Sequence, residues 1–187
     1  MTYQEFLALI KSYTIRDDAP ITSFILRAES HLRPIVRHYL AEKTIVLSII
    51  DGFADLPADF IEIRAINGTA SRYKPISINS ATLTSDEVGY YRIGSTLIFA
   101  GKVEATVKLT YYSAFTPLTE TNQNWLFENF QNVYISAVLR EFYRWEKDAE
   151  GVASEQGALN EALSVLAEDD RRGRMTGSIT IGGPTWH

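Results

Sequence analysis

Cysteine is absent from the sequence, and histidine occurs only three times. Without cysteine, the chain cannot form a disulfide scaffold, a cysteine nucleophile or a thiolate metal site. Long apolar runs are also missing. No segment approaches the roughly 18 consecutive apolar residues that indicate a transmembrane helix, so we expect no membrane contact. The opening residues, MTYQEFLALIK, have no basic lead and a short apolar run, so we expect no secretory signal.

Catalytic and cofactor motifs are absent as well. The sequence has no phosphate-binding loop, dinucleotide-binding fingerprint or nucleophile elbow. On one helix, His31 and His38 would lie about 10 Å apart, too far to hold one metal without a third element. We therefore expect two partly exposed helical histidines, no metal and no cofactor. The net charge of −5 argues against a protein that grips a phosphate backbone, because that affinity comes from lysine and arginine.

What the chain does have is apolar and aromatic residues, at 45% and 12% of its 187 positions. This composition is typical of a folded globular chain, and the length suits one domain with a sizeable core. The longest helix-like stretch runs from Asn124, a good N-cap, to about Lys147. Because it is apolar around most of its circumference, we expect it to be buried, either as the central post of a core or between subunits. Polar residues at 128–129 and 131–132 also allow a split into a short turn and a main helix.

Two further helices are predicted near the N-terminus. Thr2 followed by Glu5 is a capping-box pattern, so we expect a first helix over residues 3–12. Pro20 marks the expected start of a second helix, whose apolar face is predicted to extend over residues 20–40. Pro34 lies inside that pattern and is expected to kink or end the helix.

Residues 43–112 have the texture of β-strands. The cleanest strand is 103–112, where apolar and polar residues alternate with period two. Asn67-Gly68 and Gly94-Ser95 are hairpin signals, which predicts an antiparallel sheet. Tyrosine pairs in these strands could stack on bases or sugars, but the alternation and the lack of a basic groove favour packing within the sheet.

A last helix is predicted from Gly151 or Ser154 to Asp170, and the composition changes after it. Residues 171–187 contain no acidic residue and too little apolar surface for a core, so we expect an extended tail that becomes ordered against a partner. Its arginines could simply favour the C-terminal dipole of the helix. Tryptophan and arginine are nevertheless enriched at binding hot spots, which favours docking. The predicted docking residues are Arg171, Arg172, Arg174, Ile179, Ile181 and Trp186.

These elements together predict an α+β fold. We expect a helical bundle built from residues 2–40 and 124–170, with an antiparallel β-sheet inserted at residues 43–112. Residues 1–170 would form a single domain, followed by the extended C-terminal tail at 171–187.

Several short stretches occur in a recognisable order. They are the helix FILRAESHLR at 24–33, the corner LPADF at 56–60, YYRIGSTLI at 90–98, VKLTYY at 107–112, NWL at 124–126 and DDRR at 169–172. Their order and spacing resemble the head-to-tail connector (adaptor, tail accessory) proteins of tailed bacteriophages, and the resemblance covers about residues 20–175.

This resemblance implies a structural virion protein of the neck or tail, without enzymatic activity or cofactor, made in the cytoplasm of a bacterial host. Such proteins form a homo-oligomeric ring, usually dodecameric, beneath the portal. They bind the portal protein, extend the DNA channel and present a surface for the next tail or neck protein. Double-stranded DNA would pass through the lumen without sequence-specific binding, and residues 171–186 would dock on the portal or a neighbouring subunit. Packing between subunits is expected through Trp125, Phe127, Tyr134, Val138 and Tyr143.

Two alternatives of other classes remain. The first is a small hydrolase of cell-wall glycan within the tail, with Glu62, Glu128 or Glu141 as its acid or base. The second is a monomeric module that binds a ligand or a peptide on the face of the sheet. The hydrolase requires turnover that glutamate-to-glutamine variants lose, whereas the module requires a folded monomer that does not associate with a portal.

Overall fold

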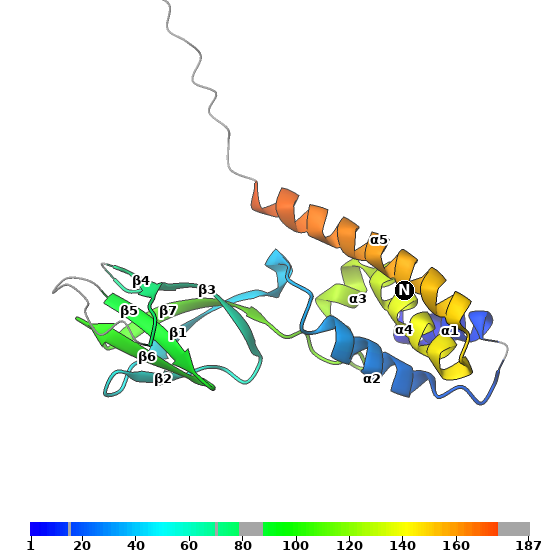
Figure 1. Cartoon of the computed structure of the whole chain (residues 1–187), viewed down its shortest axis with the longest axis horizontal. Helices are drawn as coiled ribbons and strands as arrows, with labels where there is room; N and C mark the ends of the chain where they lie inside the picture. The colour runs from blue at the N-terminus through cyan, green and yellow to red at the C-terminus, as the bar shows by residue number, and fades with distance from the viewer. Residues whose placement is uncertain (15, 70, 79–87, 176–187) are drawn as a thin grey trace, which may run out of the picture. The chain divides into compact units, whose positions relative to one another are not determined.

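Residues 1–14, 16–69, 71–78 and 88–175 are described by a computed structural model. Over these residues the backbone forms five α-helices and seven β-strands (Figure 1). The chain divides into two compact units, each treated by itself below. The helical unit comprises Met1–His31, Arg37–Tyr39 and Pro117–His187, and the sheet unit comprises Leu32–Val36 and Leu40–Thr116. The predicted combination of helices with an inserted sheet is confirmed, whereas residues 176–187 of the predicted tail lie outside the described residues.

The first two helices follow their sequence signals. Helix α1 (Tyr3–Tyr13) begins at the predicted capping box, where the Thr2 hydroxyl accepts from the Glu5 amide and the Glu5 carboxylate accepts from the Thr2 amide. Helix α2 (Ile21–Leu32) ends shortly before Pro34, which cannot continue it. The prediction that its apolar face continues to residue 40 is therefore wrong. The chain turns there and forms only a short 3-10 helix, η1 (Tyr39–Ala41).

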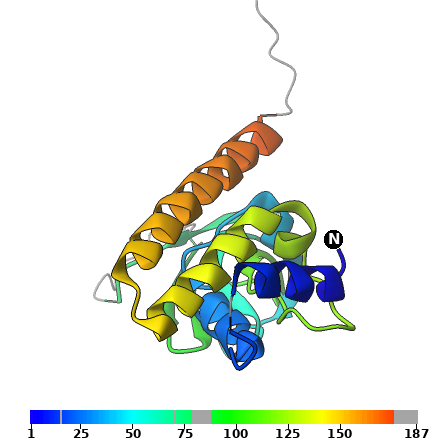
Figure 2. The same ribbon diagram turned by 90° about the vertical axis from the view of Figure 1, so that its right-hand side faces the viewer.

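The long central stretch is split in the way that its polar residues allowed. Helix α3 (Trp125–Asn129) is capped by the Asn124 side chain, which accepts from the Phe127 amide at 3.0 Å. Phe130, with φ −133° and ψ 56°, interrupts the helical path before α4 (Gln131–Glu146) begins. Most of the middle of α4 is buried, as the apolar circumference predicted. Figures 1 and 2 show α4 between α2 and α5 in the helical unit.

Helix α5 (Ala149–Arg174) is longer than predicted at both ends. Lys147 adopts a left-handed conformation that turns the chain sharply after α4. The Asp148 side chain then accepts from the Glu150 and Gly151 amides and caps the new helix. The cap and the burial of Leu159 and Leu166 outweigh the cost of about 1 kcal/mol that each internal glycine imposes.

The sheet unit contains a seven-stranded sheet that is nearly closed. Its spatial order is β1-β7-β3-β4-β5-β6-β2, and a bridge between Ile50 and Phe53 brings the two outer strands together. The strands are β1 (Glu42–Ser48), β2 (Phe53–Asp55), β3 (Phe60–Asn67), β4 (Arg72–Pro75), β5 (Val88–Ile93), β6 (Thr96–Gly101) and β7 (Thr106–Ser113).

The sheet is mixed, which corrects the prediction of a purely antiparallel one. Strands β4 and β5 pair in parallel, with Lys74 opposite Gly89 and Pro75 opposite Tyr90, whereas the other pairs are antiparallel. The predicted hairpin at Gly94-Ser95 is confirmed, since β5 and β6 pair directly around it and Gly94 has a positive φ of 59°. Strand β2 was not predicted, because three residues are too few to show a period.

Alternation along β7 builds the core of this unit. Val107, Leu109 and Tyr111 are buried on one face, as the period-two pattern predicted. The Tyr111 hydroxyl donates to Asp59 Oδ1 at 2.9 Å, and burial raises the pKa of Tyr111 to about 12, with a contribution from that carboxylate. Lys43 Nζ lies 2.6 Å from Asp59 Oδ2. Asp59 thereby links β1 and β7 to the corner that precedes β3.

Candidate interaction site

The three arginines of the predicted docking tail belong to the last turn of α5, where the helix dipole favours cations. Arg171 and Arg172 lie 2.7 and 3.4 Å from Glu168 Oε1, and Arg174 lies 2.7 Å from Asp170 Oδ2. The other predicted docking residues, Ile179, Ile181 and Trp186, lie outside the described residues. Docking by this segment therefore stays a prediction, with a defined helical starting point.

His38 fixes the chain that follows α2 to the C-terminal end of α5. Its imidazole is fully buried, and its Nε2 lies 3.2 Å from Asp169 Oδ2. The ring stacks on Trp125, with centroids 5.2 Å apart, and meets the edge of Phe130 at 5.1 Å. The prediction of an exposed helical histidine is wrong for this position because α2 ends early. It is correct for His31, whose side chain is 54% exposed on α2.

Tyr39 adds a second contact to the same end of α5. Its amide donates to Asp170 Oδ1 at 2.6 Å. A β-carbon at Gly173 would overlap the Tyr39 ring, so glycine permits this close approach. Burial raises the pKa of Asp170, but the Arg174 guanidinium and the Tyr39 amide outweigh this effect and hold that pKa below its usual value. The acidic pair at residues 169–170 is therefore a structural anchor for the chain that follows α2.

We expect the helical unit to lose stability as the pH falls below about 6.5, the ordinary pKa of histidine. Burial lowers the pKa of His38, against the attraction of Asp170 and Asp169, so the folded state favours the neutral ring. As the pH falls, protons bind the His38 ring more readily in the unfolded chain than in the folded one. The free energy of unfolding therefore decreases until the pH passes the pKa of His38 in the folded state. Denaturant unfolding at pH values of about 7.5 and 5.5 measures the decrease in the free energy of unfolding.

A His38→Gln variant is the control for this experiment, because it removes the titrating group and keeps a polar side chain. Its free energy of unfolding should change less between the two pH values than that of the wild type. Equal pH dependence in the two proteins would show that His38 is not the group responsible. Asp170 does not interfere, because its pKa is lowered further below this pH window.

The residues predicted to pack between subunits fall into two groups. Phe127, Tyr134 and Val138 have no exposed surface in the single chain. The Phe6 ring meets the first two edge-on, at centroid distances of 5.3 and 6.3 Å. Trp125 and Tyr143 are half-buried and have surface left for a partner. The contact between subunits stays a prediction, for which these two residues are the better placed.

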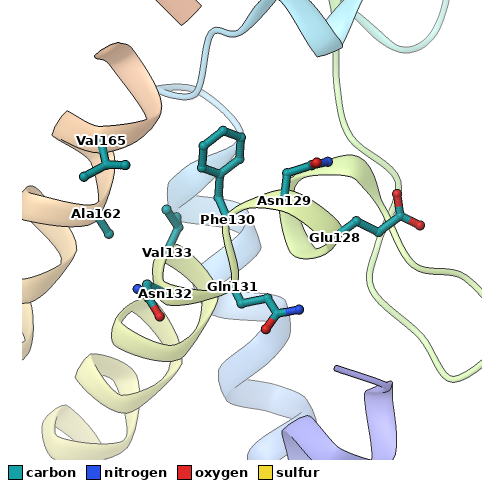
Figure 3. Close-up of a pocket in the computed structure, with 8 residues that line it drawn as sticks. All are labelled: Glu128, Asn129, Phe130, Gln131, Asn132, Val133, Ala162 and Val165. Atoms are coloured by element: carbon teal, nitrogen blue, oxygen red, sulfur yellow. The ribbon is translucent and has the colours of Figure 1, made fainter. Parts of the chain in front are cut away.

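A groove runs along α4 where it meets α5. One hollow of about 300 Å³ lies at the break between α3 and α4 (Figure 3). A second hollow of about 250 Å³ shares its lining at Asn132, Ala162 and Val165 and continues along the two helices. The lining of the first hollow is Glu128, Asn129, Phe130, Gln131, Asn132, Val133, Ala162 and Val165. Amide and apolar groups dominate it, which suits contact with another protein surface.

Glu141 of α4 is fully buried, and three arginines enclose its carboxylate. Arg27 Nε, from α2, lies 3.1 Å from Oε2. Arg140 and Arg144 each donate to Oε1 at 3.1 Å. His31 Nε2 lies 3.7 Å from Oε1. We call these five residues the Glu141 cluster. They join α2 to α4, and no pattern in the sequence indicated them as a group.

The glutamates of the hydrolase alternative lie in three different surroundings. The ion pairs of Glu141 account for its burial. Glu128 is exposed on α3 of the helical unit, and it is the one carboxylate among the described residues that line the first hollow. Glu62 is exposed on β3 of the sheet unit. Glycosidases need two carboxyl groups facing each other across a cleft, whereas the first hollow supplies one among its described residues, so it does not favour that chemistry.

The described residues form neither a metal centre nor a membrane-spanning helix. No group of three or more histidine, aspartate or glutamate side chains is arranged to hold a metal ion there. Within the same ranges, no helix combines the length and the apolar character that crossing a membrane requires.

Comparison with known proteins gives one informative result. A family model described as SU10 adaptor protein matches residues 1–181. The match therefore includes the helical segments on both sides of the sheet and the whole sheet insertion. No curated protein matches the chain.

Proposed function

Because the chain belongs to the SU10 adaptor protein family, a phage head–tail adaptor family, we propose that it forms a ring beneath the portal. Membership itself makes the chain a structural phage adaptor of the virion, which interacts with other virion components such as portal and tail proteins. In the proposal, the ring extends the DNA channel and offers an attachment surface to the next tail or neck protein. The observation that carries it is the family match across residues 1–181.

Within this function, the C-terminal end of α5 is proposed to lead a docking segment toward the portal or a neighbouring subunit. The contacts of His38 and Tyr39 support this role, because they hold the end of α5 in place. Segments that fold on binding lose conformational entropy, which apolar anchors such as Ile179 and Trp186 would offset. Three arginines in the last turn supply cations for an acidic partner.

The charge of the chain agrees with a lumen through which DNA moves. A net charge of −5 gives little attraction for the phosphate backbone, so DNA would slide through a ring without sequence-specific binding. We propose twelve subunits, the usual number in connector rings, and synthesis in the cytoplasm of the bacterial host. Both are expectations from the resemblance in the sequence.

Electron microscopy of the purified protein, alone and mixed with portal rings of its virus, tests the proposal. The portal should gain an additional annular layer. A chain truncated after Met175 keeps all of α5 and should form that layer in much lower yield. An Ile179→Ser, Trp186→Ser variant tests the anchors without shortening the chain.

The two parts of the proposal fail in different ways. If the wild-type protein stays monomeric and the portal is unchanged, the ring proposal is wrong. If the truncated chain adds the layer as readily as the wild type, the ring proposal stands and the docking role of residues 176–187 is wrong.

A further inference from the structure

The Glu141 cluster contains more positive charge than its one carboxylate balances. Arg27, Arg140 and Arg144 all contact Glu141, and none of them contacts another carboxylate among the described residues. The Arg140 Nε is buried and has no hydrogen-bond partner in the described part of the chain. Three guanidinium groups around one carboxylate leave a local excess of two positive charges, in a chain whose net charge is −5. Such an excess favours a further anion.

This excess charge reaches the surface on the outer side of α2. The side chains of Arg27 and Arg144 are 57% and 45% exposed, and that of His31 is 54% exposed. Leu26 lies beside Arg27 on α2 and is 57% exposed, although it is a large apolar residue. We call these four residues the α2 face. Arginine next to an exposed apolar side chain is typical of protein interfaces.

The outer side of α5 has the opposite character. Glu150, Ser154, Gly157 and Glu161 follow one another at steps of four, three and four, so they form one stripe, and all are exposed. Neither glutamate makes an ion pair with another described residue. A β-carbon at Gly157 would meet no atom within 4 Å, so the stripe is open. Val165, one turn beyond the stripe, is 57% exposed and borders the groove against α4. We call this stripe, with Val165, the α5 face.

We infer that the α2 face of one copy binds the α5 face of a second copy of this chain. Large cationic and apolar side chains on the first face complement small residues, two carboxylates and a groove on the second. Because α4 lies between α2 and α5 (Figure 2), the two faces belong to different sides of the helical unit. A contact between two different faces is heterologous, and it generates a closed ring when the rotation between copies closes. This inference rests on the ring proposed above and assigns its subunit contact.

A second copy suits the α2 face better than DNA does. Phosphate binding by proteins relies on arrays of lysine and arginine, whereas here a buried carboxylate stands at the centre of the cationic group. The exposed Leu26 would gain nothing from a phosphate backbone, but it would be buried in the groove beside Val165. Carboxylates also pair with guanidinium groups in a defined planar geometry, which gives a subunit contact its register.

Two substitutions at exposed positions test this contact without disturbing the Glu141 cluster. Leu26→Glu places a carboxylate on the α2 face, and Glu161→Arg places a cation on the α5 face. Each variant should associate at least about tenfold more weakly than the wild type in sedimentation velocity, because like charges then oppose each other. Lys108→Glu on β7, exposed and in the sheet unit, changes the net charge in the same direction as Leu26→Glu and should leave association unchanged.

Mixing the two variants is the sharpest part of the test. The Leu26→Glu protein keeps an intact α5 face, and the Glu161→Arg protein keeps an intact α2 face. An equimolar mixture should therefore recover association through the one junction that both substitutions leave unchanged. Circular dichroism of each variant establishes that it is folded.

The outcomes separate this inference from the ring itself. If the wild type forms rings and both substitutions leave them unchanged, the contact is wrong and the ring proposal stands. A wild type that stays monomeric, alone and with portal rings, overturns both. If Leu26→Glu and Glu161→Arg both leave the rings unchanged, and Arg27→Gln abolishes the binding of double-stranded DNA, the α2 face binds phosphates. The proposed subunit contact is then wrong.

Discussion

Replacing Glu141 by alanine should lower the free energy of unfolding by about 3–5 kcal/mol. The carboxylate is fully buried and is the shared partner of three guanidinium groups. Its removal would leave Arg140, whose side chain is 10% exposed, as a buried charge without a counter-ion. The remaining arginines would also repel each other across the space that the carboxylate occupied. Urea unfolding followed by circular dichroism measures the loss.

Arg144→Ala is the matched control. Arg144 contacts the same carboxylate, but its side chain is 45% exposed, and two other arginines remain to balance Glu141. Its loss should cost about 1 kcal/mol, as for partly exposed ion pairs. If the two variants were equally stable, the cluster would contribute through general packing, and the account of a buried counter-ion would be wrong.

Replacing Glu29 by alanine should have an effect of similar size, about 3 kcal/mol, because it removes a buried acceptor from two donors. Glu29 Oε1 accepts from the Tyr134 hydroxyl at 2.8 Å and from the Leu118 amide at 2.7 Å. Asn124 Nδ2 in turn donates to the Tyr134 oxygen at 2.7 Å. The carboxylate thus fixes α2, α4 and the chain that leads into α3 to one another.

Tyr134→Phe separates the two parts of this network. It removes the hydroxyl but leaves Glu29 paired with the Leu118 amide, so about 1–2 kcal/mol should be lost. The Glu29→Ala, Tyr134→Phe double variant should lose less than the sum of the single losses, because the two residues share a hydrogen bond. If the loss in the double variant equalled the sum of the two single losses, the hydrogen bond between Glu29 and Tyr134 would not contribute to stability.

The sequence predicted those parts of the fold whose causes are local. The capping box at Thr2 and Glu5 and the alternation along β7 each depend on residues close in the chain, and both are present. The parallel pairing of β4 with β5 joins segments on either side of residues 79–87, and no local pattern encodes it. The early end of α2 followed from Pro34. The turn that buries His38 depends on acids more than 130 residues away.

The candidate surfaces were harder to predict for a related reason. Glu29 falls on the buried side of α2, four residues after Ile25, and that spacing was the one available sign of an internal carboxylate. Glu141 looked like a polar interruption of an apolar helix, because its partner Arg27 lies more than 100 residues away. The order of short stretches nevertheless indicated the correct family, because these stretches are spread over most of the chain and do not depend on any single contact.

The edges of the sheet affect the tendency of this chain to aggregate. An open sheet presents a row of unpaired amide and carbonyl groups, on which a second molecule can add a strand and begin aggregation. Here the outer strand β2 is only three residues long, so this edge of the sheet offers little backbone to recruit another chain. Register shifts at 60–62 and 63–65 of β3 add a local bend and a stronger twist to the sheet. The short β2 edge thereby protects this side of the sheet unit against strand addition by a second molecule.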